Sequence, residues 1–318
     1  MEELLMCKKS EKAMREIRRM IIGKDQTIRQ VMTAILAGGH ILIEDIPGVG
    51  KTTLALAFSR VLGLDYQRIQ FTPDVMPTDI AGFSVYQKET GRFEYRKGAA
   101  MTNLLLADEM NRTSPKTQSA LLEAMEEGKI TVDGETRELP KPYIVIATQN
   151  PLGSIGTHSL PESQLDRFMI RISLGYPDKE SEVAMLKQGS VNVTIDEIRE
   201  QISVDELLAI RQEVEGIFVH DDILRYIVEI ANRTRSSKDL ELGISPRGTI
   251  ALLQMAKANA YLSNRSYMIP EDVKEVFLVT AGHRVIKSKE ARIQKKTREE
   301  ILKGILRTIP LPKGNRKG

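Results

Sequence analysis

The chain has 318 residues, of which 41% are hydrophobic and 28% are charged, and its formal net charge is +3. The length favours two domains over one, and the composition is that of an ordinary soluble protein. No apolar run is long enough to span a membrane, the first residues lack a signal-peptide pattern, and the single Cys7 excludes an internal disulfide. We therefore expect a cytoplasmic protein.

The positive charge is concentrated at the C-terminal end. Residues 287–318 hold eleven Lys and Arg against three Asp and Glu, a balance of +8, so residues 1–286 carry −5. Such a basic end can contact nucleic acid or an acidic partner. A solvated helix face followed by a frayed tail is the more common reason for this pattern, and we favour it.

The first half of the chain alternates helix-like and strand-like segments. Helical patterns occupy 11–20, 26–36 and 52–63. Buried strands are predicted at 40–44, 66–71, 103–107, 143–148 and 169–173. Because helices separate the buried strands, the pattern predicts an α/β fold with a doubly wound parallel sheet.

Two segments interrupt this alternation. Residues 83–96 contain two alternating runs around Gly91, and residues 130–138 place Asp133 and Gly134 between two short polar runs. Both patterns predict β-hairpins. Neither hairpin is needed to build the sheet, so each is available for a separate task.

Strand candidates end near Gly175 and Pro177. Helical patterns then follow at 181–189, 203–214, 221–234, 246–262, 271–284 and 290–306. The sequence thus predicts an α/β domain over 1–177 and a second, all-α lid domain over 178–318, which carries the basic C-terminal end.

The stretch EDIPGVGKTT has the features of a phosphate-binding loop between a strand and a helix. Gly48, Gly50, Lys51 and Thr52 fit the motif, but its first glycine is replaced by Asp45. Backbone N–H groups and a helix N-terminus attract phosphate, whereas a carboxylate in the loop would repel it. Taken alone, the loop can also be an ordinary strand-to-helix turn.

Two further strand candidates end in polar residues. LLLADE ends in Asp108 and Glu109, a pattern that suits one carboxylate in a magnesium shell and a second that polarises an attacking water. YIVIATQN ends in Gln149 and Asn150, where a neutral amide can bond both the γ-phosphate and the water.

Two arginines complete the set. Arg167 lies in QLDRF just before the last strand, and Arg247 lies in GISPRG, where Ser245 and Pro246 are typical of a helix start. Guanidinium groups stabilise charge on a transferred phosphoryl group. Each arginine alone is a typical salt-bridge partner, so the indication comes from the order of all five elements.

That order resembles an AAA+ ATPase, and the motifs LLLADEMNRTSPKTQSALLEAMEEGKITVDG, IATQNP, LPESQLDRF and ISPRG are similar to those of the MoxR family. The resemblance covers about residues 10–286. It implies a P-loop AAA+ fold that binds ATP and Mg²⁺ between the α/β domain and the lid.

The resemblance also implies roles for individual residues. The nucleotide-binding set is Ile22 and Gly23 at the adenine, Pro47, Gly48, Val49, Gly50, Lys51, Thr52 and Thr53 at the phosphates, and Arg247 as sensor 2. The catalytic set is Glu109, Asn150 as sensor 1, Arg167 as the arginine finger, and Arg247. The magnesium ligands are Thr52 and Asp108.

By the same resemblance, the protein forms a homo-oligomeric ring, commonly a hexamer, in which each arginine finger reaches a neighbour's nucleotide. Its partner would be a protein client with a von Willebrand factor A domain. The sequence departs from the family at Asp45 and at Ala99 to Met101. We expect the Asp45 carboxylate to point away from the phosphates, toward a backbone N–H or a neighbouring Lys or Arg.

Two alternatives remain, of which one is another kind of enzyme and the other belongs to a non-catalytic class. A DNA-translocating motor is compatible with the basic C-terminal end, although no DNA-binding domain is recognisable and nucleic acid is an unfavoured partner. A scaffold that binds ATP without hydrolysing it would have no need of Glu109 or Arg167. The four histidines have no metal-ligand spacing.

Overall fold

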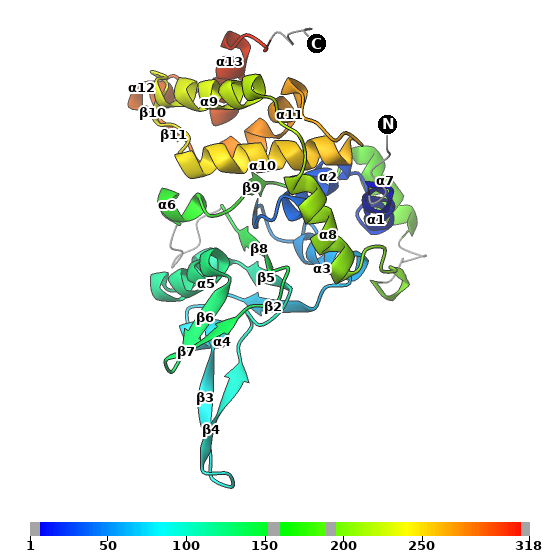
Figure 1. Ribbon diagram of the computed structural model, residues 1–318, viewed down its shortest axis with the longest axis vertical. Coiled ribbons are helices and arrows are strands. Elements are labelled where there is room, and N and C mark those ends of the chain that lie inside the picture. Colours follow the sequence, from blue (N-terminus) through cyan, green and yellow to red (C-terminus); the bar gives the residue numbers. More distant parts are fainter. Residues whose placement is uncertain (1–6, 152–159, 189–194, 313–318) are drawn as a thin grey trace.

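The structure is a computed structural model that describes residues 7–151, 160–188 and 195–312 (Figure 1). A parallel sheet with its helices forms one part of the molecule, and a group of helices, the lid, lies beside it. A long hairpin projects from the sheet domain on the side away from the lid.

The five expected strands form one parallel sheet in the order β2-β5-β8-β1-β9. Their bounds are β1 (Ile41–Glu44), β2 (Tyr66–Gln70), β5 (Leu104–Asp108), β8 (Ile144–Gln149) and β9 (Ile170–Ile172). The helices of this domain are α1 (Cys7–Met20), α2 (Asp25–Leu36), α3 (Lys51–Val61), α4 (Pro77–Ala81), α5 (Pro115–Glu127) and α6 (Glu162–Leu165), with a 3-10 turn at Met110–Arg112. The predicted α/β class is therefore confirmed.

The sheet is buried on both faces, as its nearly continuous apolar strands require. Alternate residues of β1 separate into two cores: Ile41 and Ile43 join a cluster with α1, α2, α3 and the lid helices, whereas Leu42 joins a cluster with α4 and α5. One core thus runs without interruption from the sheet into the lid, so the two domains are packed together.

Both expected hairpins are present. One consists of β3 (Gly82–Gln87) and β4 (Arg92–Lys97), and the other of β6 (Lys129–Val132) and β7 (Glu135–Glu138). The Arg137 guanidinium lies 4.2 Å from the centroid of the Tyr95 ring, so the two hairpins touch.

The lid contains α7 (Lys179–Gln188), α8 (Val204–Glu215), α9 (Asp221–Arg235), α10 (Pro246–Leu262), α11 (Pro270–Ala281), α12 (Lys289–Ile293) and α13 (Arg298–Thr308), with a 3-10 turn at Ile195–Glu197. The prediction that strands end before the lid was wrong in one detail. The short β10 (Leu240–Leu242) and β11 (Ile286–Lys287) pair antiparallel. Two or three residues are too few to show a period of two in the sequence.

Parallel strands give the sheet two distinct edges. The carboxyl edge, where the strands end, is marked by the Asp45 N–H, which donates to the Gln149 carbonyl oxygen at 3.0 Å. The amino edge, where they begin, is marked by the Met169 N–H, which donates to the His40 carbonyl oxygen at 2.8 Å. In open parallel sheets, ligands bind outside the carboxyl ends of the strands.

Candidate functional site

The glycine loop follows β1 at the carboxyl edge and leads into α3. Gly48 and Gly50 have φ angles of 84° and 90°, a left-handed region that favours glycine, and α3 begins at Lys51. A Cβ atom added at either glycine would meet no other atom within 4 Å. The loop therefore has space in front of it, and the first N–H groups of α3 suit a phosphate group there.

Lys51 lies against this loop with its side chain buried. Its ammonium donates to the main-chain oxygens of Asp45 at 2.8 Å and Ile46 at 3.1 Å. Burial lowers the pKa of Lys51, and the nearby carboxylates of Asp108, Asp45 and Glu109 act in the opposite direction. The amine is thus held at the carboxyl edge among acidic groups.

The Asp45 carboxylate is fixed by donors on the neighbouring chain segment. One oxygen accepts from the Gly175 N–H at 2.7 Å and the Ser173 hydroxyl at 2.9 Å, and the other accepts from the Ile46 N–H at 2.9 Å. Burial raises the pKa of Asp45, but these hydrogen bonds together outweigh burial and hold it below its ordinary value. The expected contact with a backbone N–H is confirmed, and this carboxylate ties the loop to the segment after β9.

Asp108 ends β5 with both carboxylate oxygens bonded. One accepts from the Thr148 hydroxyl at 2.6 Å, and the other from the Arg68 guanidinium at 2.7 Å. The same Thr148 oxygen accepts from the Glu109 N–H at 2.8 Å, so one hydroxyl fixes both acidic positions. Sequence reasoning missed Thr148 and Arg68, although Thr148 is a lone hydroxyl in an apolar strand.

Glu109 is held in an unusual conformation beside the amide residues. Its φ of 55° is rare for a residue with a side chain, and its carboxylate pairs with Arg112 at 2.7 Å. The Asn111 amide donates to the main-chain oxygen of Asn150 at 3.3 Å. The Gln149 amide nitrogen is buried and has no hydrogen-bond partner among the described residues. The acidic and amide strand ends therefore meet as the sequence predicts.

A cavity of about 570 Å³ joins the glycine loop to the turn between α1 and α2. It is lined by Met20, Ile21, Ile22, Lys24, Gly48, Val49, Gly50, Thr53, Tyr176, Pro177, Glu182 and Leu186. The expected adenine and phosphate positions thus share one cavity. Gly23 lies behind it, and a Cβ added there would come within 2.0 Å of the Ser181 hydroxyl oxygen in α7.

The donor set at this edge fits a nucleotide-bound Mg²⁺ ion. Thr52 lies in the first turn of α3, and Asp108 ends β5 of the same sheet. Across the described residues, no three His, Cys, Asp or Glu side chains gather as metal ligands. Mg²⁺ is commonly held by one or two protein groups together with phosphate oxygens and waters, so a site with few protein ligands suits it.

The two arginines lie together at the amino edge. Arg167 and Arg247 both pair with Glu126 of α5, at 2.9 Å and 3.2 Å respectively. The neighbouring Met125 carbonyl oxygen contacts the His40 ring at 3.1 Å, which places this cluster where β1 begins. Neither arginine lines the cavity at the glycine loop. The resemblance assigns Arg247 to sensor 2, and the structure places it beside Arg167.

The lid is anchored to the same edge by Asp166. Its carboxylate accepts from the Ser245 hydroxyl and from the Arg284 guanidinium, both at 2.7 Å. Burial lowers the pKa of Arg284, and the Asp166 charge opposes this effect. Because Asp166 adjoins Arg167 and Ser245 lies two residues before Arg247, the start of α10 and the Arg167 segment are tied together.

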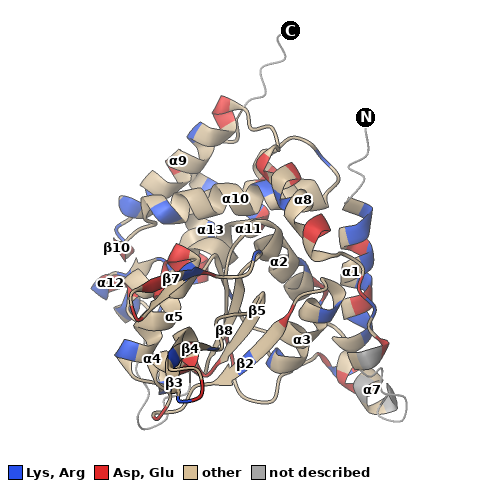
Figure 2. Ribbon diagram, turned by 60° about the horizontal axis from the view of Figure 1, so that its bottom comes forward, with Lys and Arg blue, Asp and Glu red and all other residues tan. Residues whose placement is uncertain are grey.

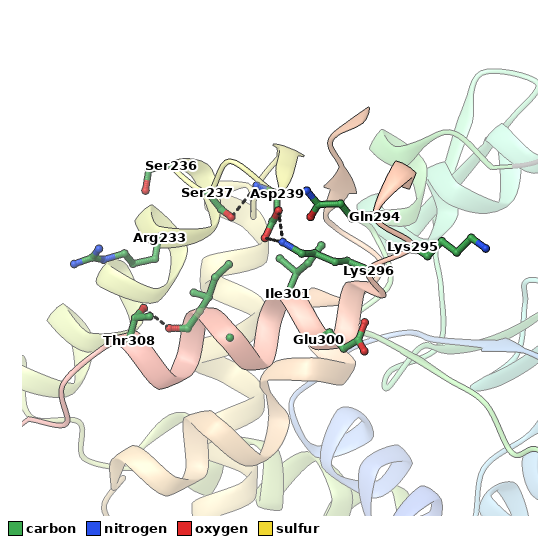
Figure 3. A pocket seen from close by; sticks show the side chains of 12 residues that line it. Arg233, Ser236, Ser237, Asp239, Gln294, Lys295, Lys296, Glu300, Ile301 and Thr308 are labelled. Atoms are coloured by element: carbon green, nitrogen blue, oxygen red, sulfur yellow. Dashed lines mark hydrogen bonds and ion pairs between the residues drawn. The ribbon is translucent and has the colours of Figure 1, made fainter. Parts of the chain in front are cut away.

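A separate cavity of about 670 Å³ lies within the lid, between the end of α9 and α13 (Figure 3). Its lining residues are Arg233, Ser236, Ser237, Asp239, Gln294, Lys295, Lys296, Glu300, Ile301, Gly304, Ile305 and Thr308. Lys296 pairs with both oxygens of Asp239 at 2.9 Å across it. None of the residues that the sequence assigns to nucleotide chemistry lines this cavity.

Comparison with known proteins agrees with this geometry. Residues 40–170 match the ATPase family associated with various cellular activities (AAA), and residues 232–305 match the AAA lid domain. The chain is 36% identical to Chaperone MoxR1 of Mycobacterium tuberculosis over 96% of this chain and 83% of that protein. The chain belongs to the MoxR family of AAA+ ATPases. The expected family is thus confirmed.

Two other similarities extend over nearly the whole length. The chain is 44% identical to the uncharacterized protein YeaC of Bacillus subtilis, over 95% of this chain and 94% of that protein. A solved structure from Cytophaga hutchinsonii is 37% identical and superposes with a TM-score of 0.90, covering 98% of this chain and 97% of that one.

Within the described part of the chain, no helix is both long and apolar enough to cross a membrane.

Proposed function

We propose that this MoxR-family protein hydrolyses ATP in a cytoplasmic homo-oligomeric ring, a hexamer, and that each site is completed by arginines of the neighbouring subunit. The observation that carries the proposal is the separation of the two sheet edges. The loop residues, Asp108 and Glu109 lie at the carboxyl edge, whereas Arg167 and Arg247 lie at the amino edge.

Within one subunit, the carboxyl edge binds the nucleotide and positions the water. The loop N–H groups and Lys51 hold the phosphates, and Thr52 and Asp108 would hold a Mg²⁺ ion, which would supply positive charge next to the phosphates. Glu109 accepts the proton of the attacking water, and Asn150 orients that water toward the γ-phosphate. The adenine lies in the cavity beside Ile22.

Glu109 changes partners during this reaction. Its carboxylate pairs with Arg112 at 2.7 Å, so it must leave this partner before it can accept a proton from the attacking water. Arg112 is almost half exposed in this pair, so exchange of the ion pair for the attacking water costs little. The Arg112 contact thereby holds the Glu109 carboxylate in place until the water arrives.

The neighbouring subunit supplies the remaining positive charge. Arg167 and Arg247 of one subunit meet the γ-phosphate held at the carboxyl edge of the next, where they stabilise charge in the transition state. An arginine supplied in this way is worth roughly 10³ to 10⁵ in rate. An isolated subunit is therefore slow.

The long hairpin is the part that contacts a client protein. Tyr86 and Phe93 form an edge-on aromatic pair near its end, with ring centroids 5.4 Å apart, and they are 53% and 73% exposed. Exposed aromatic pairs are costly in water unless they have a partner. The client that the family resemblance implies is a protein with a von Willebrand factor A domain.

The catalytic assignment is tested with Glu109→Gln, measured as ATP turnover of the assembled protein. Turnover falls by about a hundredfold or more because the general base is lost, while ATP binding persists. Glu127→Gln, which changes an exposed carboxylate of α5 paired with Lys129, is the matched control. Parent-like turnover in the Glu109 variant overturns the assignment, and its ATP-bound form is the bait for capturing a client.

The DNA-motor alternative is disfavoured because some cations of the basic C-terminal end pair with acids of the lid. Lys296 pairs with Asp239, and Lys303 pairs with Glu299. Residues 313–318 of this end lie outside the described residues. Figure 2 shows acidic segments interspersed with the basic ones. Duplex DNA that leaves turnover unchanged at low salt removes this alternative. The scaffold alternative fails if Glu109→Gln loses turnover.

A further inference from the structure

We propose that Glu126 is a positioning residue that holds Arg167 and Arg247 together as one unit for the neighbour's nucleotide. The inference deepens the proposed function and rests on it. Glu126 lies in the last turn of α5, where Gly128 ends the helix with a φ of 62°.

The contacts give each arginine its own oxygen. The Glu126 Oε2 atom lies 2.9 Å from Arg167, and the Oε1 atom lies 3.2 Å from Arg247. Arg167 belongs to the sheet domain just before β9, and Arg247 belongs to the first turn of α10 in the lid. A single carboxylate on a third element therefore joins two arginines from two domains.

Electrostatics makes this carboxylate necessary for the pair. Two guanidinium groups that lie close together repel each other. A carboxylate between them offsets this repulsion because it attracts both. Among the carboxylates of the same helix end, Glu127 pairs with Lys129 at 3.6 Å instead. Glu123 lines the same small cavity of about 220 Å³ as Glu126 and Arg167, but among the described residues it forms no ion pair with an arginine. Glu126 is therefore the carboxylate that bridges.

The pair is stable enough to orient the arginines and weak enough to release them. The side chains of Arg167, Arg247 and Glu126 are 28%, 45% and 41% exposed, and partly exposed ion pairs contribute little stability. A triphosphate presents more negative charge than one carboxylate, so both arginines exchange Glu126 for phosphate oxygens when a neighbour's site closes on them. Glu126 thus presents the two cations at a fixed spacing and does not touch the nucleotide.

The test is steady-state ATP turnover of the assembled protein carrying Glu126→Gln, which keeps the shape and removes the charge. We expect kcat to fall about tenfold, because a misplacement of about 1 Å in a catalytic group can cost up to a hundredfold. KM for ATP should stay within about twofold, because the nucleotide is held by the other subunit. Glu126→Asp, which keeps the charge on a shorter stem, should recover at least about half of the lost activity.

Glu123→Gln, one turn earlier on α5, is the matched control and should behave as the parent. The inference is overturned if Glu126→Gln matches this control, if KM rises in place of the fall in kcat, or if Glu126→Asp is as slow as Glu126→Gln in a folded, assembled protein. The reference is Arg167→Ala. If that variant turns over ATP at the parent rate, the proposed function fails; if it is inactive while Glu126→Gln is fully active, only the role of Glu126 fails.

Discussion

If each ATP site is shared between two subunits, mixing two inactive variants should restore ATP turnover. Lys51→Ala removes the amine at the carboxyl edge, and Arg167→Ala removes the guanidinium at the amino edge. Asp45 lies five positions after His40, which at about 3.3 Å per position puts roughly 16 Å between the two edges. This exceeds the length of an arginine side chain, so the two lesions affect different interfaces.

The expected recovery follows from counting interfaces. After random mixing of equal amounts, a competent site needs an intact Lys51 from one subunit and an intact Arg167 from its neighbour. About one quarter of the interfaces meet both conditions, whatever the ring size, so the mixture should reach about one quarter of the parent turnover. Each variant alone should lose roughly 10³-fold or more if Arg167 acts as proposed.

The assay is ATP turnover after subunit exchange, with co-assembly verified by a tag on one variant. Lys51→Ala mixed with Glu109→Gln is the matched control, because both lesions lie in the same site and leave no interface competent. Parent-like turnover of Arg167→Ala alone, or no recovery in a co-assembled mixture of the first two variants, would refute the assignment of Arg167 to the neighbour's nucleotide.

Two further predictions concern buried titratable groups. Burial lowers the pKa of His40 to about 4, so between about pH 6.5 and 4 the unfolded chain binds a proton that the native protein does not, and stability falls as pH falls. From about pH 7 to about pH 5 this lowers the free energy of unfolding by about 2 kcal/mol. Urea unfolding should therefore show a smaller loss of stability over this pH range in His40→Gln than in the parent or in the exposed control His220→Gln. Equal losses in all three proteins would contradict the prediction. For Asp45→Gly we expect an ATP dissociation constant within about threefold of the parent and a loss of roughly 1 to 3 kcal/mol in unfolding free energy, because buried donors lose their acceptor. A large gain in ATP affinity, measured by calorimetry, would show that the carboxylate opposes the phosphates.

The sequence predicted the parts of the fold with strong local signals. All five sheet strands were found because apolar runs of this length stand out, and both hairpins were found because glycine turns separate alternating runs. The β10–β11 pair was missed because neither strand is long enough to show a period. Thr148 and Arg68 were missed because their contacts with Asp108 cross 40 residues of chain, and no local pattern records such a pairing.

The order of elements already carried part of the information about the arginines. Lys51 follows its strand, whereas Arg167 precedes its strand, and in a parallel sheet these positions lie at opposite edges. Arg247 carried no such signal, because its position depends on how α10 packs against the sheet domain. The Asp166 contacts with Ser245 and Arg284 settle that packing across 79 and 118 residues. A motif in the lid therefore identifies a chemical group, and only the tertiary contacts show that this group lies beside Arg167.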